Sequence, residues 1–96
     1  MGTLDGKVII ITGAARGQGE AEAVLAAQAG AKVVVTDIID GQHVAKEVGG
    51  LFVTHDVTSS EQWANVVQKT LAAYGRIDGL VNNAGIWKPG GVTKAT

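Results

Sequence analysis

The 96-residue sequence predicts an α/β fold in which a parallel sheet carries helices on both faces. Short apolar runs at residues 8–12, 32–36 and 51–55, of which the first two are rich in Val and Ile, are typical of strands in a covered sheet. Each run is followed by a stretch with helical spacing, so strand and helix alternate along the chain. Right-handed crossovers between parallel strands predict the strand order 3-2-1-4, the first half of a doubly wound sheet.

The first strand and helix are expected at residues 8–12 and 17–29, with Gly30 ending the helix. The helix is rich in alanine, which allows it to lie close to a sheet. The positions expected to face the sheet share helical spacing. They are Ala21, Val24, Leu25 and Gln28.

The second strand, residues 32–36, ends at Asp37. Asp40 is suited to cap a short helix that runs to Val48, and Gly49 is expected to end that helix. This segment therefore brings a carboxylate to the carboxyl end of the second strand.

The third strand, residues 51–55, is followed directly by Asp56. Ser59 and Gln62 have the spacing of a capping box and predict the start of a longer helix, which Gly75 ends. The face of this helix that is expected to be buried consists of Trp63, Val66, Val67, Thr70, Leu71 and Tyr74.

A glycine-rich turn, residues 12–19, links the first strand to the first helix. In such a turn, glycines admit a pyrophosphate close to the backbone, and the helix start offers unpaired N–H groups to the anion. A fourth strand at residues 79–82 runs into residues 83–85. The turn, Asp37, Asp56 and residues 83–85 all follow carboxyl ends of strands, so we expect one cleft to gather them.

Composition excludes several functions. The formal net charge is -1 and no basic cluster appears, which argues against nucleic acid or anionic membranes as partners. No apolar run approaches membrane-spanning length. The absence of cysteine excludes thiolate chemistry and fits a cytoplasmic protein. His43 and His55 lack ligand spacing, so no metal site is expected.

The motifs resemble those of the short-chain dehydrogenase/reductase family, in its NAD-preferring division. Residues 12–19 read TGAARGQG and match the family's T-G-x-x-x-G-x-G turn. Residues 56–57, Asp-Val, are similar to the pair that the family places beside adenine. Residues 82–85 read NNAG, another family signature. The resemblance extends from about residue 6 to residue 85 and implies a Rossmann-like half-domain.

This resemblance implies a set of NAD-binding residues. The glycine turn would line the phosphates through its backbone, and Asp37 would hold the adenosine ribose. Asp56 would accept from the adenine amino group, and residues 83–85 would pass under the nicotinamide-side ribose. Gly19 would allow close packing of the helix. The complete set of expected cofactor contacts is Gly13, Arg16, Gly17, Gln18, Asp37, Ile38, Asp56, Val57, Asn83, Ala84 and Gly85.

Two residues favour different cofactors, one NAD and the other NADP. The carboxylate of Asp37 accepts from ribose hydroxyls and repels a 2′-phosphate, which favours NAD over NADP. The guanidinium of Arg16 is able to pair with such a phosphate. We favour NAD because Asp37 occupies the ribose position itself. Gln18 stands where the family usually has an aliphatic residue, so its amide needs a partner.

The resemblance also implies hydride transfer between an alcohol and a carbonyl compound, but these residues do not include the acid that this reaction needs. In this family a tyrosine is the acid, a lysine four residues later lowers its pKa, and a serine orients the substrate. The single tyrosine here is Tyr74, and Asp78 stands four residues later. Residues 1–85 therefore resemble the NAD-binding half of an enzyme that interconverts a secondary alcohol and a ketone or other carbonyl compound. Residues 86–96 would be a loop or tail leading to a missing second half, and the parent enzyme would be a dimer or tetramer.

Other interpretations remain at this point. The chain would also suit a nucleotide-binding module without catalysis, and Asp37 or Asp56 would then merely cap a loop or turn. An S-adenosylmethionine-binding fold also has an acid after its second strand, but it has no counterpart of residues 82–85. A phosphate-loop ATPase fails because no Gly-Lys-Ser/Thr follows Gly13. An open edge at the fourth strand would favour self-association of the 96 residues alone.

Overall fold

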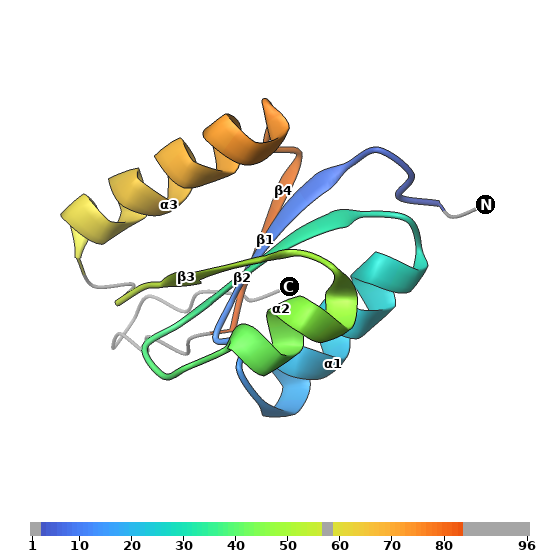
Figure 1. Cartoon of the computed structure of the whole chain (residues 1–96), viewed down its shortest axis with the longest axis horizontal. Helices are drawn as coiled ribbons and strands as arrows, with labels where there is room; N and C mark the ends of the chain where they lie inside the picture. Colours follow the sequence, from blue (N-terminus) through green and yellow to red (C-terminus); the bar gives the residue numbers. More distant parts are fainter. Residues whose placement is uncertain (1–2, 57–58, 84–96) are drawn as a thin grey trace, which may run out of the picture.

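The computed structural model describes residues 3–56 and 59–83, in which strands and helices alternate (Figure 1). Val57, Ala84 and Gly85, which the sequence assigned to the cofactor site, lie outside the described residues. No helix of the described part is long and apolar enough to span a membrane. The elements in chain order are β1 (Val8–Thr12), α1 (Gly17–Gln28), β2 (Lys32–Asp37), α2 (Gln42–Val48), β3 (Leu51–Thr54), α3 (Ser60–Tyr74) and β4 (Gly79–Asn82).

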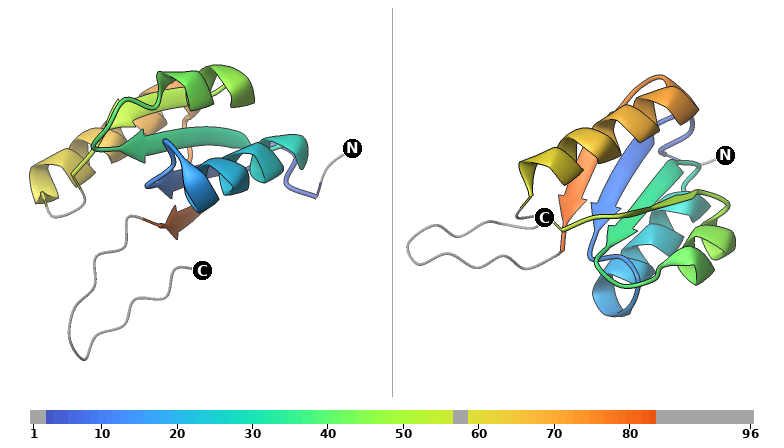
Figure 2. Two further views of the ribbon diagram at one scale, coloured as in Figure 1. Left: turned by 90° about the horizontal axis from the view of Figure 1, so that it is seen from below. Right: turned by 60° about the vertical axis from the view of Figure 1, so that its left-hand side comes forward.

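The four strands form one parallel sheet in the order β3-β2-β1-β4, which confirms the predicted topology. Helices α1 and α2 cover one face of the sheet and α3 covers the other (Figure 2). The chain moves outward from β1 to β3 and then returns to the other side of β1 for β4. The winding direction therefore reverses between β1 and β4.

Alternate residues of β1 and β2 pack on opposite faces, which explains their continuous apolar runs. On the face of α1 and α2, the central strands contribute Ile11, Val33 and Val35 to the core. On the face of α3, Ile10 and Val34 pack with Val53 of β3 and Val66 of α3. The two central strands, β1 and β2, are therefore covered by apolar side chains on both faces.

Helix α1 faces the sheet with a different side from the one predicted. Ala21, Leu25 and Gln28 are exposed, whereas Gly19 and Ala23 are buried. The cause is the close approach at the start of the helix. A Cβ atom on Gly19 would lie 2.1 Å from the carbonyl oxygen of Gly13, so only glycine fits there. Once Gly19 is against β1, helical spacing turns residues 23, 26 and 27 toward the sheet.

Helix α3 buries a narrower face than its sequence predicts. Val66 and Thr70 are fully buried, and Trp63 and Tyr74 are partly buried. Among the remaining predicted positions, Val67 and Leu71 are exposed. Within the described residues, α3 packs on the sheet with only part of its apolar face, and no other described element covers Val67 and Leu71.

The caps agree in part with the predicted ones. Ser59 Oγ accepts the N–H of Gln62 at 3.2 Å, as expected, but the Gln62 side chain accepts from Asp56 N–H instead of returning to Ser59. At α2 the N-cap position is Gly41, while Asp40 Oδ1 accepts the N–H of Gln42 at 3.0 Å. These bonds fix the starts of both helices beside the carboxyl ends of the strands.

Candidate functional site

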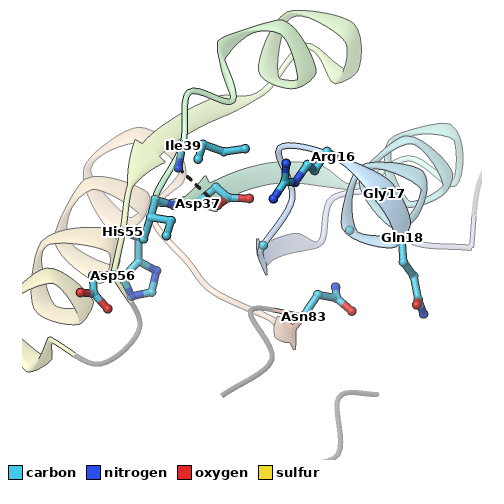
Figure 3. Close-up of a pocket in the computed structure, with 11 residues that line it drawn as sticks. Arg16, Gly17, Gln18, Asp37, Ile39, His55, Asp56 and Asn83 are labelled. Carbon is cyan, nitrogen blue, oxygen red and sulfur yellow. Dashed lines mark hydrogen bonds between the residues drawn. The ribbon is translucent and has the colours of Figure 1, made fainter. Parts of the chain in front are cut away.

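A pocket of about 560 Å³ opens at the carboxyl ends of the strands, where the winding reverses (Figure 3). Its volume is in the range typical of sites for small molecules and cofactors. It is lined by Gly13, Arg16, Gly17, Gln18, Gly19, Asp37, Ile38, Ile39, His55, Asp56 and Asn83. All the predicted contact residues that fall in the described part of the chain are in this set.

The glycine turn forms one wall of the pocket. Gly13 and Gly17 have φ values of 61° and 64°, a conformation that side-chain-bearing residues rarely adopt. The N–H of Ala14 donates to Thr36 O at 3.1 Å and ties the turn to β2. No described side chain caps the start of α1, in contrast to α3. Its first N–H groups and the positive end of the helix dipole are therefore suited to an anion.

Asp37 is the last residue of β2 and lines the pocket beside the glycine turn (Figure 3). Its Oδ2 accepts the N–H of Ala15 at 3.0 Å, so the carboxylate is tied to the glycine turn. Its Oδ1 accepts the N–H of Ile38 at 2.7 Å and that of Ile39 at 3.3 Å. These bonds fix the carboxylate at the pocket, where Oδ2, which accepts a single N–H, keeps a further lone pair for a hydroxyl group.

His55 directly follows β3, and this buried residue is part of the pocket lining. Its Nδ1 is 3.1 Å from Thr36 Oγ1, and its ring meets Trp63 edge-on at a centroid distance of 4.2 Å. In the described structure, Nε2 is buried without a hydrogen-bond partner. Burial lowers the pKa of His55 from its usual value of 6.5, and the neighbouring Asp56 carboxylate opposes this shift.

The end of β4 is joined to β1 through Thr12, which is fully buried. Thr12 Oγ1 donates to Asn82 Oδ1 at 2.7 Å and accepts the N–H of Asn83 at 3.0 Å. Asn82 therefore stabilises the pairing of β4 with β1, and Asn83 is held at the pocket. The side-chain amide of Asn83 donates to the carboxylate of Glu22 on α1.

The predicted contacts did not include four residues at the site: Gly19, which was expected only to allow helix packing, and Ile39, His55 and Glu22. Ile39 lines the pocket beside Ile38, and His55 was considered only as a metal ligand. Glu22 does not line the pocket but contacts two residues that do. The sequence offered one signal for Glu22: it stands four residues after Gln18, whose amide needed a partner, and Gln18 Nε2 does donate to Glu22 Oε2 at 3.3 Å.

The described side chains do not suggest a metal centre or a complete catalytic group. They contain no cluster of three or more residues suited to hold a metal ion. Tyr74 does not line the pocket and packs against the core on the α3 face. What the described side chains offer to the pocket is the backbone of the glycine turn and the carboxylates of Asp37 and Asp56.

A parallel sheet in the order 3-2-1-4, with a glycine turn at the reversal of winding, defines a Rossmann-like domain. The family model for short chain dehydrogenases matches residues 7–96. The chain therefore belongs to the short chain dehydrogenase family of oxidoreductases, as its motifs predicted. Members of this family use nicotinamide cofactors.

Individual relatives agree with this assignment. Tropinone reductase-like 2 of Erythroxylum coca is 47% identical over 87 residues, which cover 86% of this chain and 32% of that protein. The 3-oxoacyl-(acyl-carrier-protein) reductase of Thermotoga maritima is 48% identical over 90 residues, covering 86% of this chain and 37% of that one. The chain spans about a third of the length of the first curated relatives that it matches.

A solved structure shows the same architecture. The 3-ketoacyl-(acyl-carrier-protein) reductase of Brucella melitensis, complexed with NADH, superposes with a TM-score of 0.79 at 37% identity. The superposition covers 82% of this chain and 34% of that one. The similarity therefore extends over most of the described fold.

Proposed function

We propose that this chain binds NAD(H) in the pocket at the carboxyl ends of the strands. In this proposal the chain is the cofactor-binding part of an oxidoreductase that interconverts a secondary alcohol and a carbonyl compound. The observation that carries it is the pairing of two features across one pocket: the uncapped start of α1 and the carboxylate of Asp37. The first suits a diphosphate and the second suits the hydroxyls of a ribose.

The residues present fit a dinucleotide. There is no space for a side chain between Gly19 of α1 and Gly13 of the turn, so the helix start lies close to the pocket. The exposed side chain of Ile38 and the carboxylate of Asp56 line the part beyond Asp37, where an adenine would lie between an apolar surface and an acceptor. At the other end, Asn83 would lie beside the second ribose. When bound, the nicotinamide supplies or accepts the hydride.

We propose NAD rather than NADP as the cofactor. The carboxylate of Asp37 is fixed by three backbone N–H groups and so stays at the pocket wall, where it would repel a 2′-phosphate. Arg16 also lines the pocket and would attract that phosphate, but its long side chain is exposed and solvated. A fixed charge at the ribose outweighs a solvated charge beside it.

The 96 residues are expected to bind the cofactor without turning over an alcohol. Hydride transfer to a carbonyl needs an acid beside the reacting oxygen. The only tyrosine, Tyr74, packs in the core on the opposite side of the sheet from α1. In the proposed parent enzyme, which would act in the cytoplasm as a dimer or tetramer, further sequence would supply that acid.

Titration of the chain with NADH, followed by nicotinamide fluorescence, tests the proposal. We expect saturable binding that is competed by ADP. A lack of response to NADH together with a response to S-adenosylmethionine would refute the proposal. Oxidation of a secondary alcohol by the purified 96-residue chain would refute the claim that its acid lies elsewhere.

The cofactor preference is tested with Asp37→Ala. We expect the ratio of NADH affinity to NADPH affinity to fall about tenfold or more, because repulsion of a 2′-phosphate and hydrogen bonding to the ribose are lost together. The ratio is the informative quantity, because loss of the bond to Ala15 weakens both cofactors. Asp40→Ala removes the same charge three residues away, outside the pocket lining, and should leave the ratio unchanged. Equal losses for both cofactors in Asp37→Ala would remove the argument for NAD.

A further inference from the structure

We propose that Glu22 of α1 is a positioning residue for the nicotinamide-side half of the pocket, and that it acts through Asn83. The inference rests on the proposed function, which places adenosine at the Asp37 end and the second ribose at the Asn83 end. Glu22 itself stands outside the pocket lining, so it is not expected to touch the cofactor. Its effect comes from the two hydrogen bonds that its carboxylate accepts from side-chain amides.

The carboxylate of Glu22 bridges the first turns of α1 and the end of β4. Its Oε1 accepts from Asn83 Nδ2, and its Oε2 accepts from Gln18 Nε2 at 3.3 Å. An ionised carboxylate only accepts hydrogen bonds, so both amides must turn their NH₂ groups toward it. The orientation of each amide is therefore decided chemically by Glu22.

This orientation determines what Asn83 is able to offer a ligand. Its backbone N–H is already given to Thr12 Oγ1 at 3.0 Å, and its side-chain NH₂ is directed to Glu22. The acceptor that remains on the side chain is the amide oxygen. Hydroxyl groups of a ribose are donors that such an oxygen accepts. Without Glu22, rotation about the side-chain bonds would let the amide present either end.

Gln18 has a supporting part in this arrangement. It lies four residues before Glu22 on α1, and its bond to Oε2 helps to hold the carboxylate in place for Asn83. The bond between Glu22 and Asn83 joins α1 to the residue that follows β4, 61 positions later in the sequence. The walls of the pocket that flank the proposed nicotinamide end are thus held together by one half-buried carboxylate.

Electrostatic repulsion and positioning predict opposite effects on NADH affinity when the Glu22 carboxylate is removed. A carboxylate on the helix that binds a diphosphate repels that diphosphate, so its loss alone should strengthen binding. Positioning predicts weaker binding, because the amide of Asn83 is no longer oriented. The sign of the change therefore distinguishes the two explanations.

The test measures the affinities of NADH and ADP for the wild type, Glu22→Ala and Glu22→Gln. We expect Glu22→Ala to weaken NADH about threefold to tenfold, the effect of about one misplaced hydrogen bond, and to change ADP less than about twofold. Glu22→Gln keeps one acceptor oxygen and should fall between the wild type and Glu22→Ala. The matched control is Glu20→Gln, which removes a charge nearer to the start of α1 and should not weaken NADH.

Each result decides the inference. Unchanged or tighter NADH binding in Glu22→Ala would overturn it while leaving the proposed function intact. Equal losses for NADH and ADP, or a loss that follows a lowered melting temperature in both Glu22 variants, would show a structural role only and would also overturn it. If the wild type fails to bind NADH, the proposed function and the inference fall together. In the favourable case, the side-chain amide NMR signals of Asn83 and Gln18 shift in Glu22→Ala and stay in place in Glu20→Gln.

Discussion

At the scale of the single residue, His55 makes the fold sensitive to pH. Its imidazole is buried between Thr36 and Trp63, so the charged form loses its hydration. The Asp56 carboxylate favours the charged form but does not outweigh burial, and the pKa in the folded state is lowered. In the unfolded chain the pKa returns to about 6.5. Below that pH the unfolded state therefore binds the proton more readily than the folded state.

We therefore expect the free energy of unfolding to fall as the pH is lowered through about 6.5 toward the depressed pKa of folded His55. The slope is at most about 1.4 kcal/mol per pH unit, since one proton is involved. Urea unfolding at pH 7.5 and at pH 5.5 measures it.

Replacement of each histidine separates the contributions. His55→Gln should reduce the difference between the two pH values, whereas His43→Gln, at an exposed position, should preserve it. A full pH dependence in His55→Gln would contradict this account of the buried imidazole.

At the scale of the element, the two long helices begin in different ways that match their tasks. Helix α1 has no side-chain cap, which leaves its first N–H groups for a ligand. Helix α3 begins outside the pocket and is capped by Ser59, whose Oγ accepts from Gln62 N–H. At α3 a side chain satisfies a backbone N–H group of the first turn and stabilises the helix. At α1 the first backbone N–H groups are available for a ligand.

Ser59→Ala should lower the free energy of unfolding by about 1 kcal/mol, because it removes this N-cap bond. Chemical denaturation measures the change. The adjacent Ser60 is exposed and is the first residue of α3, so Ser60→Ala should have little effect or should stabilise slightly through helix propensity. Equal effects of the two substitutions would show that Ser59 does not act as a cap.

At the scale of the whole molecule, the sheet has an edge at β4 and an incompletely covered layer beside it. Among the described strands, β1 is the only neighbour of β4. Leu80, in register with the buried Ile10, is 52% exposed, and Val67 and Leu71 of α3 are also exposed. An unpaired strand edge beside apolar side chains favours association with another chain.

We expect the 96-residue chain to self-associate through this edge, and Leu80→Lys to raise its monomer fraction at equal protein concentration. Sedimentation equilibrium measures both. Leu25→Lys introduces the same change at another exposed leucine, which lies on α1 at the opposite face of the sheet, and should leave association unchanged. A wild type that is monomeric throughout, or an equal response to both substitutions, would contradict the prediction.

The sequence predicted the strands, their order and the part of the site that is local. Val and Ile runs identify strands that are covered on both faces, and the handedness of crossovers leaves few ways to arrange them. The glycine turn and Asp37 were found because each directly follows a strand, and the carboxyl ends of parallel strands meet at one edge.

What the tertiary structure alone decided depends on contacts between distant segments. Spacing could not say which side of α1 faces the sheet, because that side is set by the close contact of Gly19 with Gly13. Nor could it pair Glu22 with Asn83, or bury His55 against Trp63, because each contact joins different elements. Periodicity and handedness act along the chain and are readable from it, whereas shape and close approach arise only when the elements pack.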